Sequence, residues 1–335
     1  MYFDLTSFAC IRIYGPDCQK FLQSQLTNDI SLLEKTNEHS ATVMNRSQLT
    51  AYCNPKGRII SLMKICRTNN DDYFIVAPSS LVNTIKKRFT IYKLRADVHL
   101  SDETDEYQIF AIIDEHGDKD FSSKFVEFGE EAFIFSDSFY NTQGEKYILI
   151  AQKQHSEQVL TSIAQKLQCN EKPESFWLTF EIREGIPWFT SELTETLLPQ
   201  QINLDLIQAV SFEKGCYPGQ EIVARMHYLG KPKRRSFLLV SQHFQLEEPT
   251  LIHEHPIRIY NKNISDEEEV GSLITFSNYA FHGKELTFYG LGEFDLGRMA
   301  SLGDNSFFIK STRGVFDLTL GTLPFQNKII TDNKC

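Results

Sequence analysis

The chain has 335 residues, a length that allows two or three structural units. Hydrophobic residues make up 41% and charged residues 23%, and these proportions exclude bulk disorder. The net charge of −10 argues against a protein that binds nucleic acid over its whole surface. No apolar run approaches the roughly 18 residues of a membrane span, and the N-terminus lacks the basic and apolar segments of an export signal. We therefore expect no membrane association.

The seven cysteines predict a reducing, cytoplasmic environment, because their number is odd and no Cys-x-x-Cys pair occurs. The same pattern argues against a disulfide framework or a structural zinc site. His253 and His255 form the one close histidine pair, and no cysteine or further histidine completes a ligand set. We expect no metal site.

The first elements are a strand and a helix. Residues 8–14 alternate around Ile11 and Ile13, and Asp17 is placed to cap a helix that carries Phe21 and Leu22. A hairpin follows, because the sequence Asn-Pro-Lys-Gly at 54–57 suits a tight turn between two strands.

Strands and helices alternate through the middle of the chain. Leu81, Ile85 and Phe89 recur every fourth residue and predict an amphipathic helix. Strands are expected near 107–113 and 146–151, followed by a helix that carries Val159, Leu160, Ile163 and Leu167 and by another around 176–184. From about residue 237, short β-like runs separated by turn residues predict a small all-β domain. The expected class is α+β, with one domain over 1–230, built of two interleaved subdomains, and another over 231–335.

One segment carries a chemical signature. Gly215 and Gly219 flank Cys216, so the backbone can turn tightly and present the thiol on a loop. Lys214 could favour the thiolate, as could the start of a helix after Gly219. The alternative is a small buried side chain, since free cysteine is often buried. His227 is the nearest histidine, and nothing in the sequence ties it to the thiol as a base.

The same region concentrates positive charge. Residues 213–235 hold six cations and two carboxylates, which gives +4 in a chain of −10. This stretch suits an anion such as a polyglutamate tail, a phosphate or an RNA backbone. A solvated linker between two domains is the other interpretation.

The pattern Lys214-Gly215-Cys216-Tyr217-x-Gly219-Gln220-Glu221, followed by Arg225, resembles the signature of the YgfZ-type folate-binding proteins, relatives of the glycine cleavage aminomethyltransferase (T-protein). Further stretches agree with the resemblance, which runs from about residue 8 to 240. They are Gly15-x-Asp17, Phe21-Leu22-Gln23-x-Gln25-x-Thr27-x-Asp29, Lys56-Gly57-Arg58, Gly185-Ile186-Pro187, and Pro199-Gln200 with Asn203-Leu204.

The resemblance implies an aminomethyltransferase-like ring of subdomains with a C-terminal β-barrel. It implies a folate-binding accessory protein, with tetrahydrofolate or a one-carbon derivative as cofactor, in the maturation or repair of iron–sulfur enzymes such as a tRNA methylthiotransferase. It favours an accessory protein over an ordinary turnover enzyme; a turnover enzyme of this kind would be a tetrahydrofolate-dependent transferase. Two alternatives stay open, a true T-protein and a module that contacts tRNA directly through residues 225–235.

Two departures from the T-protein pattern argue against aminomethyl transfer. Where the T-protein has adjacent carboxylates in the strand after the Gly57-like glycine, this chain has Ser61 and Leu62. Where the T-protein has a glutamate that holds the pterin, this chain has Arg183, with Glu184 one residue away. A carboxylate reads the amide and amino edge of such a ring well, whereas a guanidinium does not read it in the same way.

The resemblance also places the site residues. Phe8 and Trp177 correspond to aromatic positions that contact folate, and packing in the core is the alternative for both. Cys216 and Lys214 are the expected catalytic residues. The expected cofactor-binding residues are Phe8, Trp177, Arg183, Tyr217, Gln220, Glu221 and Arg225.

Overall fold

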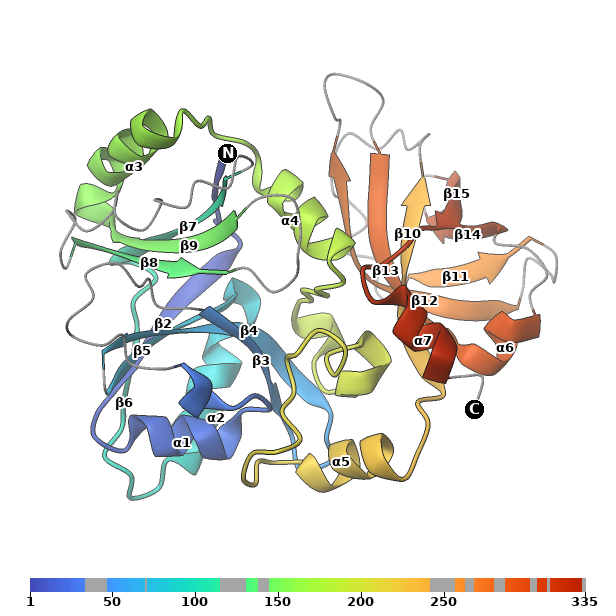
Figure 1. The fold of residues 1–335 in the computed structure, drawn as a ribbon, viewed down its shortest axis with the longest axis horizontal. Coiled ribbons are helices and arrows are strands. Elements are labelled where there is room, and N and C mark those ends of the chain that lie inside the picture. Colours follow the sequence, from blue (N-terminus) through green and yellow to red (C-terminus); the bar gives the residue numbers. More distant parts are fainter. Residues whose placement is uncertain are drawn as a thin grey trace. The chain divides into compact units, whose positions relative to one another are not determined.

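The computed structural model describes residues 1–33, 47–69, 71–114, 131–137, 145–241, 257–262, 268–279, 287–301, 306–311 and 314–332. The chain forms two compact units (Figure 1). Unit 1 comprises Met1–Glu174 and Gln208–Gln220, and unit 2 comprises Ser175–Ile207 and Glu221–Cys335. Among the described residues, no helix has the length and apolar character needed to span a membrane. His253 and His255 lie outside the described residues.

The first sheet of unit 1 is antiparallel, with the strand order β3-β4-β5-β2-β6. Helices α1 and α2 pack on it, and the ring of Phe89 in α2 lies 5.4 Å from Phe21 of α1 and 4.9 Å from Tyr52 of β3. The helical spacing of Ile85 and Phe89 therefore buries the face that the sequence predicts. The elements are β2 (Phe8–Tyr14), α1 (Cys18–Gln25), the 3₁₀ turn η1 (Ile30–Leu32), β3 (Ser47–Cys53), β4 (Ile59–Asn69), β5 (Asp72–Pro78), η2 (Ser79–Leu81), α2 (Val82–Tyr92) and β6 (His99–Asp102).

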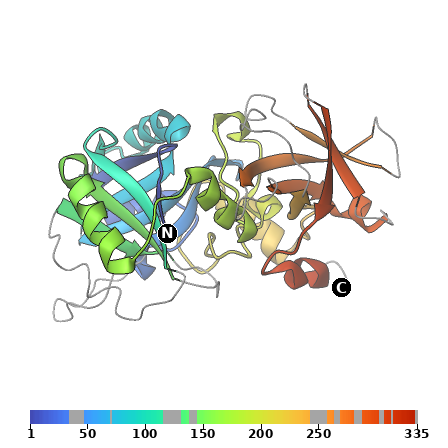
Figure 2. The ribbon, with the colours of Figure 1, turned by 90° about the horizontal axis from the view of Figure 1, so that it is seen from above.

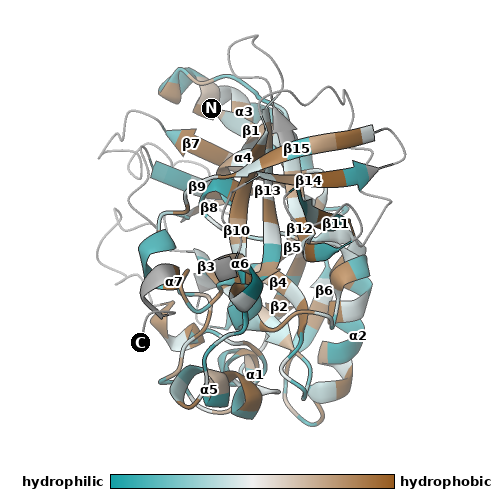
Figure 3. Ribbon diagram, turned by 90° about the vertical axis from the view of Figure 1, so that its right-hand side faces the viewer, coloured by the Kyte–Doolittle hydropathy of each residue, from teal (hydrophilic) through white to brown (hydrophobic). Residues whose placement is uncertain are grey.

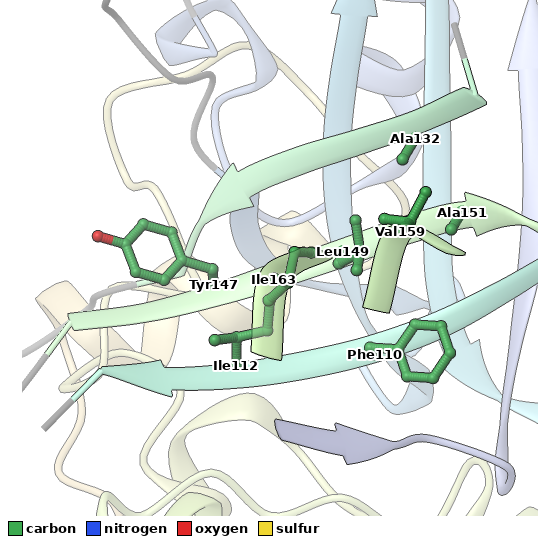
Figure 4. Packing of buried hydrophobic residues seen from close by; sticks show 8 residues of the cluster. All are labelled: Phe110, Ile112, Ala132, Tyr147, Leu149, Ala151, Val159 and Ile163. Carbon is green, nitrogen blue, oxygen red and sulfur yellow. The ribbon is translucent and has the colours of Figure 1, made fainter. Parts of the chain in front are cut away.

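The second sheet of unit 1 has the order β1-β7-β9-β8, and helix α3 covers one of its faces (Figure 2). Val159 and Ile163, four residues apart on α3, point toward Ile112 and Leu149 of the sheet (Figure 4). This contact forms the core of the layer. The elements are β1 (Tyr2–Asp4), β7 (Tyr107–Asp114), β8 (Ala132–Ser136), β9 (Glu145–Gln152) and α3 (Lys153–Leu167).

Unit 2 contains a closed six-stranded barrel in the order β10-β13-β12-β11-β14-β15, with β10 and β15 pairing to complete the ring. Closure leaves no strand edge for pairing with another chain. The elements are α4 (Glu174–Arg183), η4 (Ser191–Leu193), η5 (Pro199–Ile202), α5 (Gln220–Tyr228), β10 (Arg234–Ser241), β11 (Arg258–Asn261), β12 (Glu269–Tyr279), β13 (Thr287–Asp295), α6 (Leu296–Ser301), β14 (Ser306–Ser311), β15 (Gly314–Leu320) and α7 (Gln326–Asp332).

The α+β class and the C-terminal barrel are confirmed, while the compact units divide the chain differently from the predicted boundary after residue 230. Residues 175–207 group with the barrel, because polar contacts bind them to β10. Asn203 Nδ2 donates to the carbonyl oxygen of Ser236 at 2.8 Å, and the Arg235 guanidinium bonds both carboxylate oxygens of Asp205 at 2.6 and 2.9 Å. A bidentate buried pair of this kind is strong and directional.

The predicted cap of α1 is corrected. Asp17 occupies the N-cap position, but its side chain makes no capping hydrogen bond to α1. The carboxylate instead accepts a hydrogen bond from the backbone N–H of Asp97 at 2.9 Å. The predicted hairpin at 54–57 is confirmed, with Asn54 N–H donating to the carbonyl oxygen of Arg58 and Gly57 N–H to that of Asn54, both at 2.9 Å.

Candidate functional site

Lys214 anchors the start of the loop that carries Cys216. Its side chain is 8% exposed, and Nζ donates to the carbonyl oxygens of Leu26 at 2.6 Å and Asn28 at 2.8 Å. Burial lowers the pKa of Lys214 to about 8, against the opposing effect of Asp29. Two backbone acceptors of another segment thus occupy the ammonium group, so it holds the loop in place. A catalytic role for Lys214 stays a prediction.

Tyr217 and Gln220 fix the other side of the loop. Tyr217 is 6% exposed, and its ring centroid lies 5.5 Å from Lys214 Nζ. Burial raises the pKa of Tyr217. Gln220 N–H donates to the Tyr217 carbonyl oxygen at 3.1 Å, and Gln220 Nε2 lies 3.4 Å from the carbonyl oxygens of Lys214 and Gly215. Both side chains serve the geometry of the loop, and their contact with a cofactor stays a prediction.

Gly219 lets the loop pack directly on the β3–β4 hairpin. Its φ is +81°, and a Cβ atom there would lie 2.4 Å from the Cα of Gly57 and 2.5 Å from the carbonyl oxygen of Asn54. Side chains other than hydrogen are excluded by both the dihedral angle and the space. The glycine motifs near 57 and 219, which the sequence shows as separate, therefore meet in one contact.

The segment next to the loop is held by residues that follow α1. Thr27 Oγ1 donates to the carbonyl oxygen of Ala209 at 2.7 Å. Asn28 Nδ2 donates to the carbonyl oxygens of Leu49 and Gln208, at 2.9 and 2.7 Å. These hydrogen bonds explain why the residues at 27 and 28, which follow the apolar positions of α1, are polar.

Cys216 is exposed, as its setting between two glycines predicts. By contrast, Cys10, Cys18, Cys53 and Cys66 are buried, and burial raises the pKa of each thiol. Deprotonated thiols are the reactive form. Cys169 is half-buried, and burial raises the pKa of its thiol as well. Cys216 is thus the one exposed thiol among the described cysteines. Cys335 lies outside the described residues.

The structure reduces the basic stretch at 213–235 to three exposed cations. Lys214 bonds to backbone carbonyls, Arg235 pairs with Asp205, and Arg234 lies 2.8 Å from Glu293. Arg225, Lys231 and Lys233 are exposed. Glu221, also exposed, lies in the first turn of α5, the helix that begins at Gln220 and carries Arg225 in its last turn. The net +4 of the sequence overstates the charge that this stretch offers to an anion.

An aromatic and acidic stripe runs along helix α4 and its end, where Trp177, Glu181 and Glu184 follow i, i+4, i+7 spacing and all three are buried. Glu184 directly follows the last residue of α4. Glu181 is the member of the stripe that the sequence analysis missed. Trp188 Nε1 donates to Glu181 Oε2 at 2.9 Å, and the rings of Trp177 and Trp188 lie 6.3 Å apart. The sequence does carry a signal for this stripe, because the two glutamates follow Trp177 at the spacing of one helix face. A carboxylate thus lies in the same stripe as Trp177, although Arg183 occupies the expected acidic position.

The other predicted folate contacts lie in both units. Phe8, in β2 of unit 1, is 5% exposed, and Trp177 of unit 2 is 2% exposed. Both rings are thus covered as core side chains are, and stacking on folate stays a prediction. Arg183 places its guanidinium 5.8 Å from the ring centroid of Tyr289. Ser61 and Leu62 are buried in β4, where the Ser61 hydroxyl donates to the Leu62 carbonyl oxygen.

The fold is that of the aminomethyltransferases. The glycine cleavage system aminomethyltransferase T from Bartonella henselae matches 97% of this chain and 85% of its own, with a TM-score of 0.68 at 12% sequence identity. This likeness establishes the fold class alone. No family model matches the sequence.

Curated relatives establish the family. A tRNA-modifying protein YgfZ from Colwellia psychrerythraea is 30% identical over 255 residues, which cover 73% of this chain and 72% of that protein. A tRNA-modifying protein YgfZ from Aliivibrio fischeri is 26% identical over 244 residues and 70% of each chain. The chain belongs to the YgfZ family of tRNA-modifying proteins.

Proposed function

We propose that this chain is a folate-binding accessory protein for iron–sulfur enzymes that act in tRNA methylthiolation, and that it works through the thiol of Cys216. The observation that carries the proposal is the exposed Cys216 between buried anchors, Lys214 and Tyr217. The name of its relatives, tRNA-modifying protein, supports the link to tRNA. We also propose a cytoplasmic location, because an odd number of cysteines without a Cys-x-x-Cys pair favours a reducing compartment.

A rigidly presented thiol suits work on iron–sulfur clusters. Thiolates are the usual ligands of such clusters, and cluster transfer requires a ligand that a client enzyme can reach. Lys214, Tyr217 and Gly219 fix the backbone on each side of Cys216, so the thiol is held at the surface with little freedom lost on docking. Here the cluster is the cargo, and the client is an enzyme such as a tRNA methylthiotransferase.

The residues of α4 fit a pterin in type. Trp177 offers a ring for stacking, and Glu181 offers a carboxylate of the kind that reads an amide and amino edge. Tetrahydrofolate, when bound, would supply one-carbon chemistry. Since Trp177 is 2% exposed, a ring that stacks on it must displace the atoms that now cover it. Folate binding is therefore expected to change the environment of this indole.

The thiol is tested in cells that lack the endogenous protein and receive variants of this chain. Cys216→Ala should abolish the restoration of methylthiolated tRNA nucleosides, measured by mass spectrometry. The purified variant should keep its melting temperature, because an exposed side chain contributes little packing. Cys169→Ala, at a half-buried cysteine, is the control and should restore the modification. Full restoration by Cys216→Ala would show that the thiol is not the working group.

Folate binding is tested by titrating tetrahydrofolate while intrinsic fluorescence and heat are recorded. Trp177→Ala should weaken binding by about tenfold, since one stacked ring contributes roughly 1–3 kcal/mol. Trp188→Phe leaves Trp177 as the one indole of the chain, and its fluorescence should still respond to ligand in that variant. Equal affinity of the wild type and Trp177→Ala would exclude this ring as the stacking platform. It would leave the test of Cys216 unaffected.

A further inference from the structure

Helix α2 and the turn after it form a basic segment in an acidic protein. Between Asp72 and Asp97 there is no carboxylate, and residues 86–95 contain five cations. Lys86 lies 3.4 Å from Asp102, and Lys93 Nζ donates to the Val98 carbonyl oxygen. In the described part of the chain, no carboxylate pairs with the exposed Lys87 or Arg95. The segment carries +5 where the whole chain carries −10.

Large apolar side chains are exposed within the same segment. Ile91 is 58% exposed, Tyr92 is 44% exposed and Leu94 is 85% exposed. Lys87 and Ile91, one helical turn apart, share the outward face of α2, opposite the buried Ile85 and Phe89. Figure 3 shows hydrophilic and hydrophobic residues side by side on this helix. Exposed apolar side chains grouped within four residues are typical of an interaction surface.

Leu94 adopts a backbone conformation that favours glycine or asparagine. Its φ is +47°, in the turn that follows the last residue of α2. A residue with a Cβ atom is strained in this region, and the strain costs stability. Burial does not offset that cost, because the leucine is 85% exposed. The strain therefore occurs at an exposed leucine that follows Ile91 and Tyr92 in the chain.

We propose that Lys87, Ile91, Tyr92, Leu94 and Arg95, named here the α2 surface, dock an acidic, apolar segment of a partner protein. Positive charge in an otherwise acidic chain selects a partner with carboxylates. Isoleucine and leucine gain nothing from a phosphate backbone, so the exposed aliphatic pair favours a protein over RNA. Along the chain, Lys87 and Arg95 stand on either side of the exposed apolar residues, so the surface combines apolar contact with flanking charge, as protein interfaces do. It lies within unit 1 and requires neither folate nor Cys216.

The test uses the full chain and a labelled model peptide of about 20 residues, with leucine at helical spacing and glutamate at the remaining positions. Fluorescence anisotropy should show binding that weakens as salt rises, and no binding to the same peptide with lysine in place of glutamate. Lys87→Glu with Arg95→Glu should abolish binding. Lys20→Glu with Lys153→Glu changes the net charge equally at exposed positions elsewhere in unit 1 and should leave binding intact.

Leu94→Asn separates docking from folding. Asparagine tolerates a positive φ, so this variant should keep or raise the melting temperature while it weakens peptide binding by about tenfold. A purely structural leucine would instead lower the melting temperature. Three results would overturn the proposal: failure of the acidic peptide to bind, unchanged binding by Leu94→Asn, or preference of the α2 surface for a labelled single-stranded RNA over the acidic peptide.

Discussion

At the scale of single residues, exposure separates Cys216 from the four buried cysteines among the residues that the structure describes. The thiols of Cys10, Cys18, Cys53 and Cys66 are inaccessible, and burial raises the pKa of each. In a Cys335→Ser background, limiting iodoacetamide at neutral pH should therefore alkylate Cys216 first, as peptide mass spectrometry would show. Modification of any buried cysteine before Cys216 would contradict this description of the loop.

The burial of Lys214 predicts that the stability of the protein depends on pH. Its ordinary pKa is 10.5, and burial lowers it to about 8 in the folded protein. Between these values the unfolded chain binds more protons than the folded one, so this lysine adds stability as pH rises from about 8 to 10.5, by about 3 kcal/mol in all. Lys214→Met removes this contribution. Unfolding free energies are measured with urea for both proteins. Over that window the wild type should gain stability relative to Lys214→Met as pH rises. A loss of stability relative to the variant would contradict the lowered pKa.

At the scale of elements, the loop of residues 215–219 and the β3–β4 hairpin act as one structural feature. Gly219→Ala places a Cβ atom 2.4 Å from Gly57 at a φ of +81°, so we expect a destabilisation of about 1–3 kcal/mol and reduced protection of the hairpin in hydrogen exchange. Gly215→Ala is the matched control, because a Cβ atom there meets nothing within 4 Å. Equal effects of the two substitutions would show that the contact with the hairpin is unimportant.

At the scale of the whole molecule, an aminomethyltransferase fold does not predict aminomethyl transfer. Ser61 and Leu62 supply no carboxylate at the positions where the resemblance to the T-protein requires one, and both side chains are buried in β4. With an aminomethylated lipoyl carrier and tetrahydrofolate, the protein should form no methylenetetrahydrofolate above the uncatalysed rate. Turnover at a rate typical of an enzyme would contradict this prediction. If the Cys216→Ala variant also turned over, the protein would be an aminomethyltransferase that does not use this thiol.

The sequence by itself determined the elements and the cysteine loop. The apolar period of Ile85 and Phe89 and the turn residues at 54–57 act between near neighbours in the chain, so their structure follows from local geometry. Two glycines beside Cys216 likewise predicted an exposed loop from local flexibility alone.

Only the tertiary structure decided which charges and glycines meet. Lys214 lies two residues from Cys216, yet its ammonium bonds to carbonyls at 26 and 28, because a buried donor takes the acceptors that the fold brings within reach. Gly57 and Gly219 are far apart in the chain and touch in the fold.

The fold also decides which cations stay exposed. In the basic stretch at 213–235, three of the six cations are held by partners such as Asp205 and Glu293, whereas Lys87 and Arg95 of the α2 surface are exposed. Contacts between distant residues depend on packing of the whole chain, which residue spacing does not encode.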